Sequence, residues 1–122
     1  MKTILIADDH LSVRNALRSV LNAVPGLSVC AEAQEGQEAV ERALKLHPDL
    51  ILLDLSMPVL NGLEAAHTLK KAMPDVRILL FTGHPTKFSE ACAAASGVDA
   101  FVAKGDDVGR LVHQARSLLS MA

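Results

Sequence analysis

The chain has 122 residues, half of them hydrophobic, and a formal net charge of −2 at pH 7. This length is that of one domain with a real core, and a charge near zero gives no electrostatic basis for binding nucleic acid or an anionic membrane. No segment reaches the ~18 apolar residues of a membrane span, and no signal-peptide pattern precedes the first apolar run, so we expect a cytoplasmic protein.

The beginning of the chain has the pattern of a strand, a helix and a second strand. An apolar run at residues 3–7 predicts a strand, and the apolar residues of 13–24 recur at helical spacing until Pro25-Gly26 ends the pattern. Residues 27–33 alternate between apolar and polar side chains, which is typical of a half-exposed strand at the edge of a sheet.

A second helix and a buried strand follow. The apolar residues of 39–44 form a helical face that ends at His47-Pro48. Residues 50–55 are apolar except for Asp54, as expected of a strand that is buried on both faces. Asp54 is therefore a lone carboxylate at the end of an apolar strand.

The next part of the chain continues this alternation. Asn61 and Glu64 have the spacing of a capping box and predict the start of a helix that ends before Pro74. Residues 76–82 predict a fourth strand, and an alanine-rich stretch at 87–96 predicts a fourth helix.

The last elements complete the fold prediction. Residues 100–103 predict a fifth strand, followed by a helix whose apolar side chains recur from Val108 to Leu119. Five strand–helix units of this length predict an α/β, flavodoxin-like fold, in which helices cover both faces of a five-stranded parallel sheet. The edge-like second and fifth strands favour the strand order 2-1-3-4-5, in a single domain over residues 1–122.

The two cysteines, Cys30 and Cys92, lie in apolar surroundings and form no CxxC motif. We expect both to be reduced, buried thiols, because cysteines in such segments usually behave as small hydrophobic residues.

Polar residues lie at the carboxyl ends of four predicted strands. Asp8 and Asp9 follow the first strand, Asp54 ends the third, Thr82 ends the fourth and Lys104 follows the fifth. The carboxyl ends of parallel strands lie at one edge of a sheet, and in this strand order ligands bind there, next to the first and third strands. We therefore expect these side chains to meet.

Their chemistry suits phosphoryl transfer. Carboxylates that converge on one place repel one another and raise at least one pKa unless a cation lies among them. His10 is the only histidine or cysteine at this edge, so the oxygen-rich set favours a hard cation, and Mg²⁺ suits it best. A carboxylate beside Mg²⁺ and a lysine can attack phosphorus to form an aspartyl phosphate, while the hydroxyl of Thr82 bonds a phosphoryl oxygen.

Each of these residues also has an ordinary structural explanation. An Asp after a strand is often a turn or helix-capping residue, Lys104 before a glycine can be a solvated turn residue, and Thr82 can be a simple strand residue. The combination favours chemistry, because independent turn residues have no reason to share one sheet edge with complementary groups.

Four segments carry a family resemblance, namely ILIADDH, PDLILLDLSMPVLNGLEA, PDVRILLFTG and AFVAKG. In this order and spacing they resemble the receiver domain of two-component response regulators, over essentially the whole chain. DDH and DLSMPVLNGLEA further resemble the receivers that carry a C-terminal LuxR/NarL-type helix-turn-helix domain.

The resemblance implies that Asp54 is the phosphoacceptor and takes a phosphoryl group from a sensor histidine kinase. Asp9 and Asp54 would bind Mg²⁺ through carboxylates, Asp8 through water and Ser56 through its backbone carbonyl, while Lys104 would hold the phosphate. Such a domain catalyses its own phosphorylation and dephosphorylation and is not a turnover enzyme.

The resemblance also implies how the signal is passed on. Thr82 would be the switch hydroxyl and Phe101 the switch aromatic residue, which together reshape the face made by helix four, strand five and helix five. Ser56 and His84 occupy positions that tune the lifetime of the phosphoryl group in this family. A phosphorylation-dependent homodimer is a further implication.

No DNA-binding module follows the last predicted helix. We therefore expect either a stand-alone receiver that acts by protein contact or, as the subgroup resemblance favours, a piece of a longer regulator. DNA would then be bound only through an output domain outside this chain.

Three other functions compete with this one. A haloacid dehalogenase-type phosphatase also uses a strand-end Asp with Mg²⁺, but it needs a second Asp two residues on, where this chain has Ser56. A flavin or nucleotide binder is disfavoured, because no G-x-G-x-x-G or P-loop follows the first strand and the chain has no Trp or Tyr. A degenerate receiver would keep the fold without being phosphorylated, although all the acidic residues are present.

Overall fold

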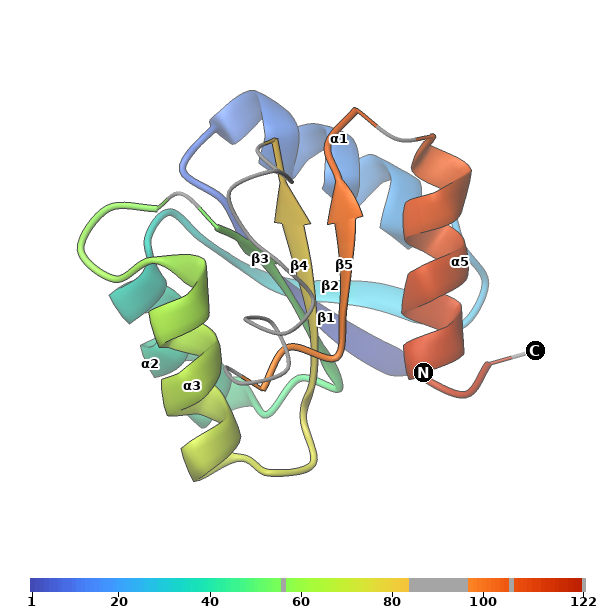
Figure 1. Cartoon of the computed structure of the whole chain (residues 1–122). Helices are drawn as coiled ribbons and strands as arrows, with labels where there is room; N and C mark the ends of the chain where they lie inside the picture. The colour runs from blue at the N-terminus through green and yellow to red at the C-terminus, as the bar shows by residue number, and fades with distance from the viewer. Residues whose placement is uncertain (56, 84–96, 106, 122) are drawn as a thin grey trace.

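A computed structural model describes residues 1–55, 57–83, 97–105 and 107–121. In this part of the chain, strands and helices alternate as predicted up to β4, and the strands form one parallel sheet in the order β2-β1-β3-β4-β5 (Figure 1). The predicted flavodoxin-like fold and its strand order are confirmed. The strands are β1 (Lys2–Ala7), β2 (Leu27–Ala33), β3 (Leu50–Asp54), β4 (Arg77–Thr82) and β5 (Ala100–Ala103).

Helices cover both faces of the sheet. The described helices are α1 (Leu11–Asn22), α2 (Gly36–Leu46), α3 (Gly62–Ala72) and α5 (Val108–Leu118). Figure 1 shows α2 and α3 on one side of the sheet, with α1 and α5 on the other. The molecule is therefore built in three layers, with one hydrophobic cluster on each face of the sheet.

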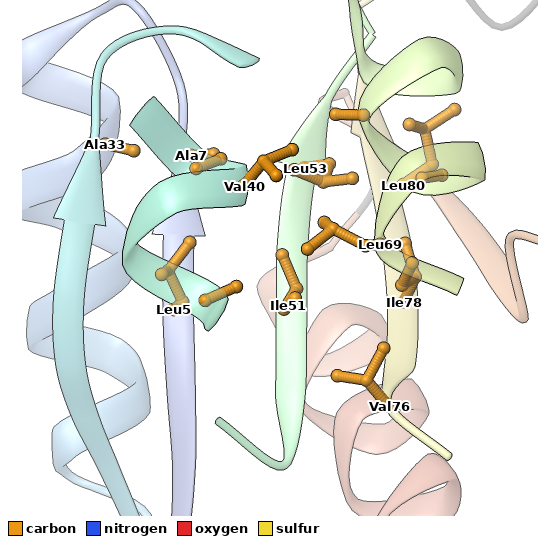
Figure 2. Close-up of a cluster of buried hydrophobic side chains, with 14 of the residues drawn as sticks. Leu5, Ala7, Ala33, Val40, Ile51, Leu53, Leu69, Val76, Ile78 and Leu80 are labelled. Carbon is orange, nitrogen blue, oxygen red and sulfur yellow. The ribbon is translucent and has the colours of Figure 1, made fainter. Parts of the chain in front are cut away.

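Alternate residues of each central strand supply these two clusters. Ile51 and Leu53 of β3 point toward α2 and α3, as Figure 2 shows, whereas Leu50 and Leu52 belong to the cluster beneath α1 and α5. All of β3 is buried, as predicted for a strand covered on both faces. Because burying one such side chain stabilises the fold by about 1.5–3 kcal/mol, the central strands anchor the sheet edge at which they end.

The predicted capping box at the start of α3 is confirmed. The side chain of Asn61 accepts a hydrogen bond from the backbone N–H of Glu64, and the Glu64 carboxylate accepts one from the backbone N–H of Asn61. Two backbone donors that have no partner within the helix are satisfied in this way. The capping box fixes where the chain re-enters regular structure after β3.

The prediction that Cys30 is buried is wrong, because the residue is exposed. It lies on the edge strand β2, where the register with β1 shifts: Ile4 pairs with Val29 and Leu5 with Ala31, so Cys30 is passed over. Partial burial still raises the pKa of its thiol. Cys92 and the helix predicted at residues 87–96 lie outside the described residues.

The helical spacing predicts Val108 on the apolar face of the last helix, but the residue is 49 % exposed. It is the first residue of α5, and the contacts of that helix with the sheet begin one turn later, at Leu111. None of the described helices is long and apolar enough to cross a membrane.

Candidate functional site

The fold brings the ends of four strands to one edge of the sheet. Asp8 follows β1, Asp54 is the last residue of β3, Thr82 is the last residue of β4 and Lys104 follows β5. β1 and β3 are hydrogen-bonded neighbours, and Ala7 pairs with Leu53 at their carboxyl ends. The two carboxylates that follow these paired residues therefore come together, as the sequence predicted.

Two of the acids are buried and share one ammonium group. Asp8 is 1 % and Asp54 4 % exposed. Lys104 Nζ lies 2.8 Å from Asp8 Oδ2 and 3.4 Å from Asp54 Oδ2. A buried carboxylate is costly unless an opposite charge is near it, so Lys104 offsets the cost of burying both acids.

The acidic neighbours of Lys104 in turn stabilise the charged form of the lysine. Burial acts to lower the pKa of Lys104, but the contact with Asp8 and the negative charges of Asp54 and Asp8 outweigh burial and raise it. Its Nζ also lies 5.9 Å from the centre of the Phe81 ring, at the limit of a cation–π contact. The ammonium is therefore a permanent positive charge in the pocket at neutral pH.

His10 is part of the same pocket. Its Nδ1 lies 3.2 Å from Asp8 Oδ1 and 2.9 Å from Asp9 Oδ1, and its backbone N–H donates to Asp8 Oδ1 over 2.9 Å. The sequence placed His10 at this edge, but no motif assigned it a role. Its closeness to Asp9 in the chain was the one available signal.

The donor atoms of this pocket suit a metal ion. One ligand atom from each of Asp8, Asp9, His10 and Asp54 can be chosen so that all four lie within 4.8 Å of one another. Asp8 Oδ2 is fully buried, and the Lys104 ammonium lies 2.8 Å from it. Carboxylate oxygens gathered in this way, two of the three acids being buried, fit a hard divalent cation such as Mg²⁺.

A buried arginine binds the backbone of the loop after β1, which carries Asp8 and Asp9 and is called the acidic loop. Arg14 of α1 is 7 % exposed, donates from Nη1 to the backbone carbonyl of Asp8 over 2.7 Å, and donates from Nε to Glu32 of β2 over 3.2 Å. Arg18 also contacts Glu32, at 2.8 Å. Sequence reasoning missed this network, because the pairing of a helix residue with a strand residue depends on how α1 lies on the sheet.

We expect Arg14→Met to lower the free energy of unfolding by about 2 kcal/mol, because it leaves the Asp8 carbonyl without its charged donor. Arg18→Met is the matched control. Its side chain is 49 % exposed, so its loss should cost less than about 1 kcal/mol. Urea denaturation of the two variants measures both values, and equal losses would contradict the support role of Arg14.

Two glycines allow close backbone contacts near Asp54, one with Asp54 itself and one with Leu60. A Cβ on Gly62, the first residue of α3, would lie 2.4 Å from the carbonyl oxygen of Asp54. A Cβ on Gly36, the first residue of α2, would lie 1.9 Å from the carbonyl oxygen of Leu60. Only residues without a side chain allow these approaches, so Asp54 lies closely against the N-terminus of α3 and Leu60 against the N-terminus of α2.

The remaining predicted site residues are placed only in part. Phe101 of β5 pairs with Leu80 of β4, is half-buried and packs against the cluster under α2 and α3. Thr82 pairs with Ala103 at the end of β4, but its side chain lies outside what the structure describes. Ser56 and His84 also lie outside the described residues.

Comparisons with known proteins point to one family. Residues 4–116 match the response regulator receiver domain family. The chain is 35 % identical over 116 residues to the nitrate/nitrite response regulator NarL of Escherichia coli strain K12, covering 93 % of this chain and 54 % of that protein. It is 36 % identical over 101 residues to the response regulator VraR of Staphylococcus saprophyticus, covering 83 % of this chain and 48 % of that one. The chain spans about half the length of the curated relatives it matches.

Solved structures agree as well. A LuxR-family two-component response regulator from Aurantimonas sp. superimposes with a TM-score of 0.90 at 31 % identity, over 98 % of this chain and 86 % of that one. The response regulator TrrA from Thermotoga maritima, solved in complex with Mg²⁺ and BeF, superimposes with a TM-score of 0.87 at 30 % identity, over 97 % and 99 % of the two chains. The chain therefore belongs to the response regulator receiver domain family, and its relatives are regulators of the NarL/LuxR type.

Proposed function

We propose that residues 1–122 form one phosphoacceptor domain of a two-component phosphorelay, in which Asp54 accepts a phosphoryl group from a histidine kinase. The observation that carries the proposal is the pair of buried carboxylates, Asp8 and Asp54, bridged by the Lys104 ammonium at the carboxyl edge of the sheet. An oxygen of Asp54 forms the new bond to phosphorus as the bond from phosphorus to the kinase imidazole nitrogen breaks. The bonding electron pair stays on that nitrogen.

Asp9 and Asp54 would hold Mg²⁺ through their carboxylates, Asp8 through water and Ser56 through its backbone carbonyl. Mg²⁺, when bound, would neutralise negative charge on the phosphoryl oxygens. Lys104 would hold another of these oxygens, from the side of the pocket where its ammonium already contacts Asp8 and Asp54. The Mg²⁺ and BeF in the complex of the similar protein TrrA support this choice of metal.

The phosphorylated state would be passed on through Thr82 and Phe101. The hydroxyl of Thr82 would bond the phosphoryl group, and Phe101 would turn inward, reshaping the surface of the fourth helix, β5 and α5. Ser56 and His84 would set the lifetime of the aspartyl phosphate. The half-buried position of Phe101 on β5 supports its part, because a side chain at the rim of the core can occupy an inner or an outer position.

The partners follow from the same proposal. They would be a sensor histidine kinase, a second copy of the chain after phosphorylation, and DNA only through an output domain outside this chain. The name of one similar protein, the transcriptional regulatory protein DegU of Brevibacillus brevis, supports an output in transcription. The domain would work in the cytoplasm as a signalling protein that transfers a phosphoryl group to itself, without turnover of other substrates.

The test is incubation with an acyl phosphate and Mg²⁺, followed by intact-protein mass spectrometry. We expect one phosphate adduct on the wild type and none on Asp54→Asn. Asp75→Asn is the matched control, because Asp75 is exposed between α3 and β4, and it should behave as the wild type does. An adduct that survives Asp54→Asn, or steady release of phosphate from a phosphate ester, would overturn the proposal.

A further inference from the structure

His10 is the one residue of the acidic pocket to which the proposed function assigns nothing. It is the N-cap residue of α1, yet its side chain makes no capping hydrogen bond to the helix. Instead, its Nδ1 lies 2.9 Å from Asp9 Oδ1 and 3.2 Å from Asp8 Oδ1. The ring therefore contacts both acids through Nδ1, although 63 % of the His10 side chain is exposed to solvent.

The spacing of these three atoms is also that of ligands around one metal ion. A metal–ligand distance of about 2.1 Å places neighbouring ligand atoms of an octahedron about 3.0 Å apart. The distances from Nδ1 to the two carboxylate oxygens are 2.9 and 3.2 Å, and one ligand atom from each of Asp8, Asp9, His10 and Asp54 can be chosen within 4.8 Å of the others. The imidazole can therefore bind the same ion as the acids with little movement.

Lys104 does not compete with the imidazole for the same oxygens. The ammonium contacts the Oδ2 atoms of Asp8 and Asp54, whereas His10 contacts the Oδ1 atoms of Asp8 and Asp9. The pocket thus has a lysine side and a histidine side. A cation on the histidine side would gain a nitrogen ligand without displacing the ammonium.

We propose that His10 Nδ1 is a ligand of this pocket and gives it a preference for divalent transition-metal ions over Mg²⁺. Imidazole nitrogen is a good ligand for Mn²⁺, Co²⁺, Ni²⁺ and Zn²⁺, whereas Mg²⁺ selects oxygen. The inference rests on the proposed function in one respect, that Asp9 and Asp54 bind a divalent cation. It adds that the ion held best is one that accepts a nitrogen ligand.

The test compares metal binding by wild type and His10→Gln. Co²⁺ titration followed by visible absorption should show an affinity at least about tenfold lower for the variant, while Mg²⁺ affinity from calorimetry stays nearly equal. Pulsed electron paramagnetic resonance of the Mn²⁺-loaded wild type should show coupling to a nitrogen nucleus, and His10→Gln should lose it. His113→Gln, exposed on α5, is the matched control and should keep both signals.

Asp54→Asn should also weaken Co²⁺ binding, because the ion lies at the same site. Equal Co²⁺ affinity of wild type and His10→Gln, or no nitrogen coupling in the wild type, would overturn the inference. The two proposals can be separated. If His10→Gln still forms the Asp54 adduct with Mg²⁺ while the nitrogen signal is absent from the wild type, the proposed function stands and only the role of His10 is wrong. If the wild type binds no divalent ion, both are wrong.

Discussion

Replacing Lys104 with methionine is expected to slow phosphorylation of Asp54 by an acyl phosphate by about a hundredfold or more. The change removes the fixed positive charge that would stabilise the phosphoryl group during transfer. Methionine keeps much of the length and the apolar contact of the lysine stem, so the change is mainly one of charge. The rate is measured by intact-protein mass spectrometry over time. Lys71→Met, an exposed change on α3, is the control and should leave the rate unchanged.

The same variant should bind Mg²⁺ more tightly. In the wild type the ammonium lies 2.8 Å from Asp8 and 3.4 Å from Asp54, so it repels a cation that approaches the same carboxylates. A faster or equal rate, or a weaker affinity for Mg²⁺, would contradict the role of Lys104. Opposite changes in rate and affinity are not what general unfolding would produce, so the two measurements together separate a charge effect from a loss of structure.

Gly36→Ala is expected to lower the free energy of unfolding by about 3 kcal/mol, the upper part of the usual range for overpacking. The added Cβ would lie 1.9 Å from the carbonyl oxygen and 2.6 Å from the carbonyl carbon of Leu60, so backbone has to move. Helix propensity alone predicts the opposite sign, because alanine is favoured over glycine by about 1 kcal/mol within a helix. Urea denaturation measures which effect is larger.

Gly105→Ala is the matched control for this change. Nothing lies within 4 Å of a Cβ at Gly105, which is exposed, and its replacement should change stability by no more than about 0.5 kcal/mol. A neutral or stabilising Gly36→Ala would show that the segment around Leu60 moves aside without cost. It would then be wrong to regard that segment as fixed by its contact with α2.

Local patterns of the sequence were enough to predict the architecture. The alternation of apolar runs and helical faces determines five strand–helix units, and the handedness of their connections leaves few strand orders. The capping box at Asn61 and the burial of β3 up to Asp54 also depend on residues close in the chain, and both are confirmed. The convergence of the strand ends follows from the parallel direction of the strands together with their order.

Features that depend on side-chain packing between distant segments were not predicted. The ion pair of Arg14 with Glu32 requires the position of α1 over β2, and the contact of Gly36 with Leu60 requires the path of a loop. Apolar neighbours in the sequence predict burial of Cys30, but the residue is exposed on an edge strand whose register with β1 shifts beside it. The alternation over residues 27–33 places Cys30 at a polar position of the edge strand, between Ser28 and Glu32, and exposure was therefore the better prediction.

The contacts of Arg14 have a consequence for protein engineering. This one side chain joins the carbonyl of Asp8 to Glu32, and so ties together the loop after β1, helix α1 and strand β2. An acidic loop moved into another βα scaffold without both Arg14 and Glu32 would retain its carboxylates but lose the tether that fixes its backbone. The smallest transplantable unit of this pocket therefore extends through the second strand, well beyond the motif that carries the acids.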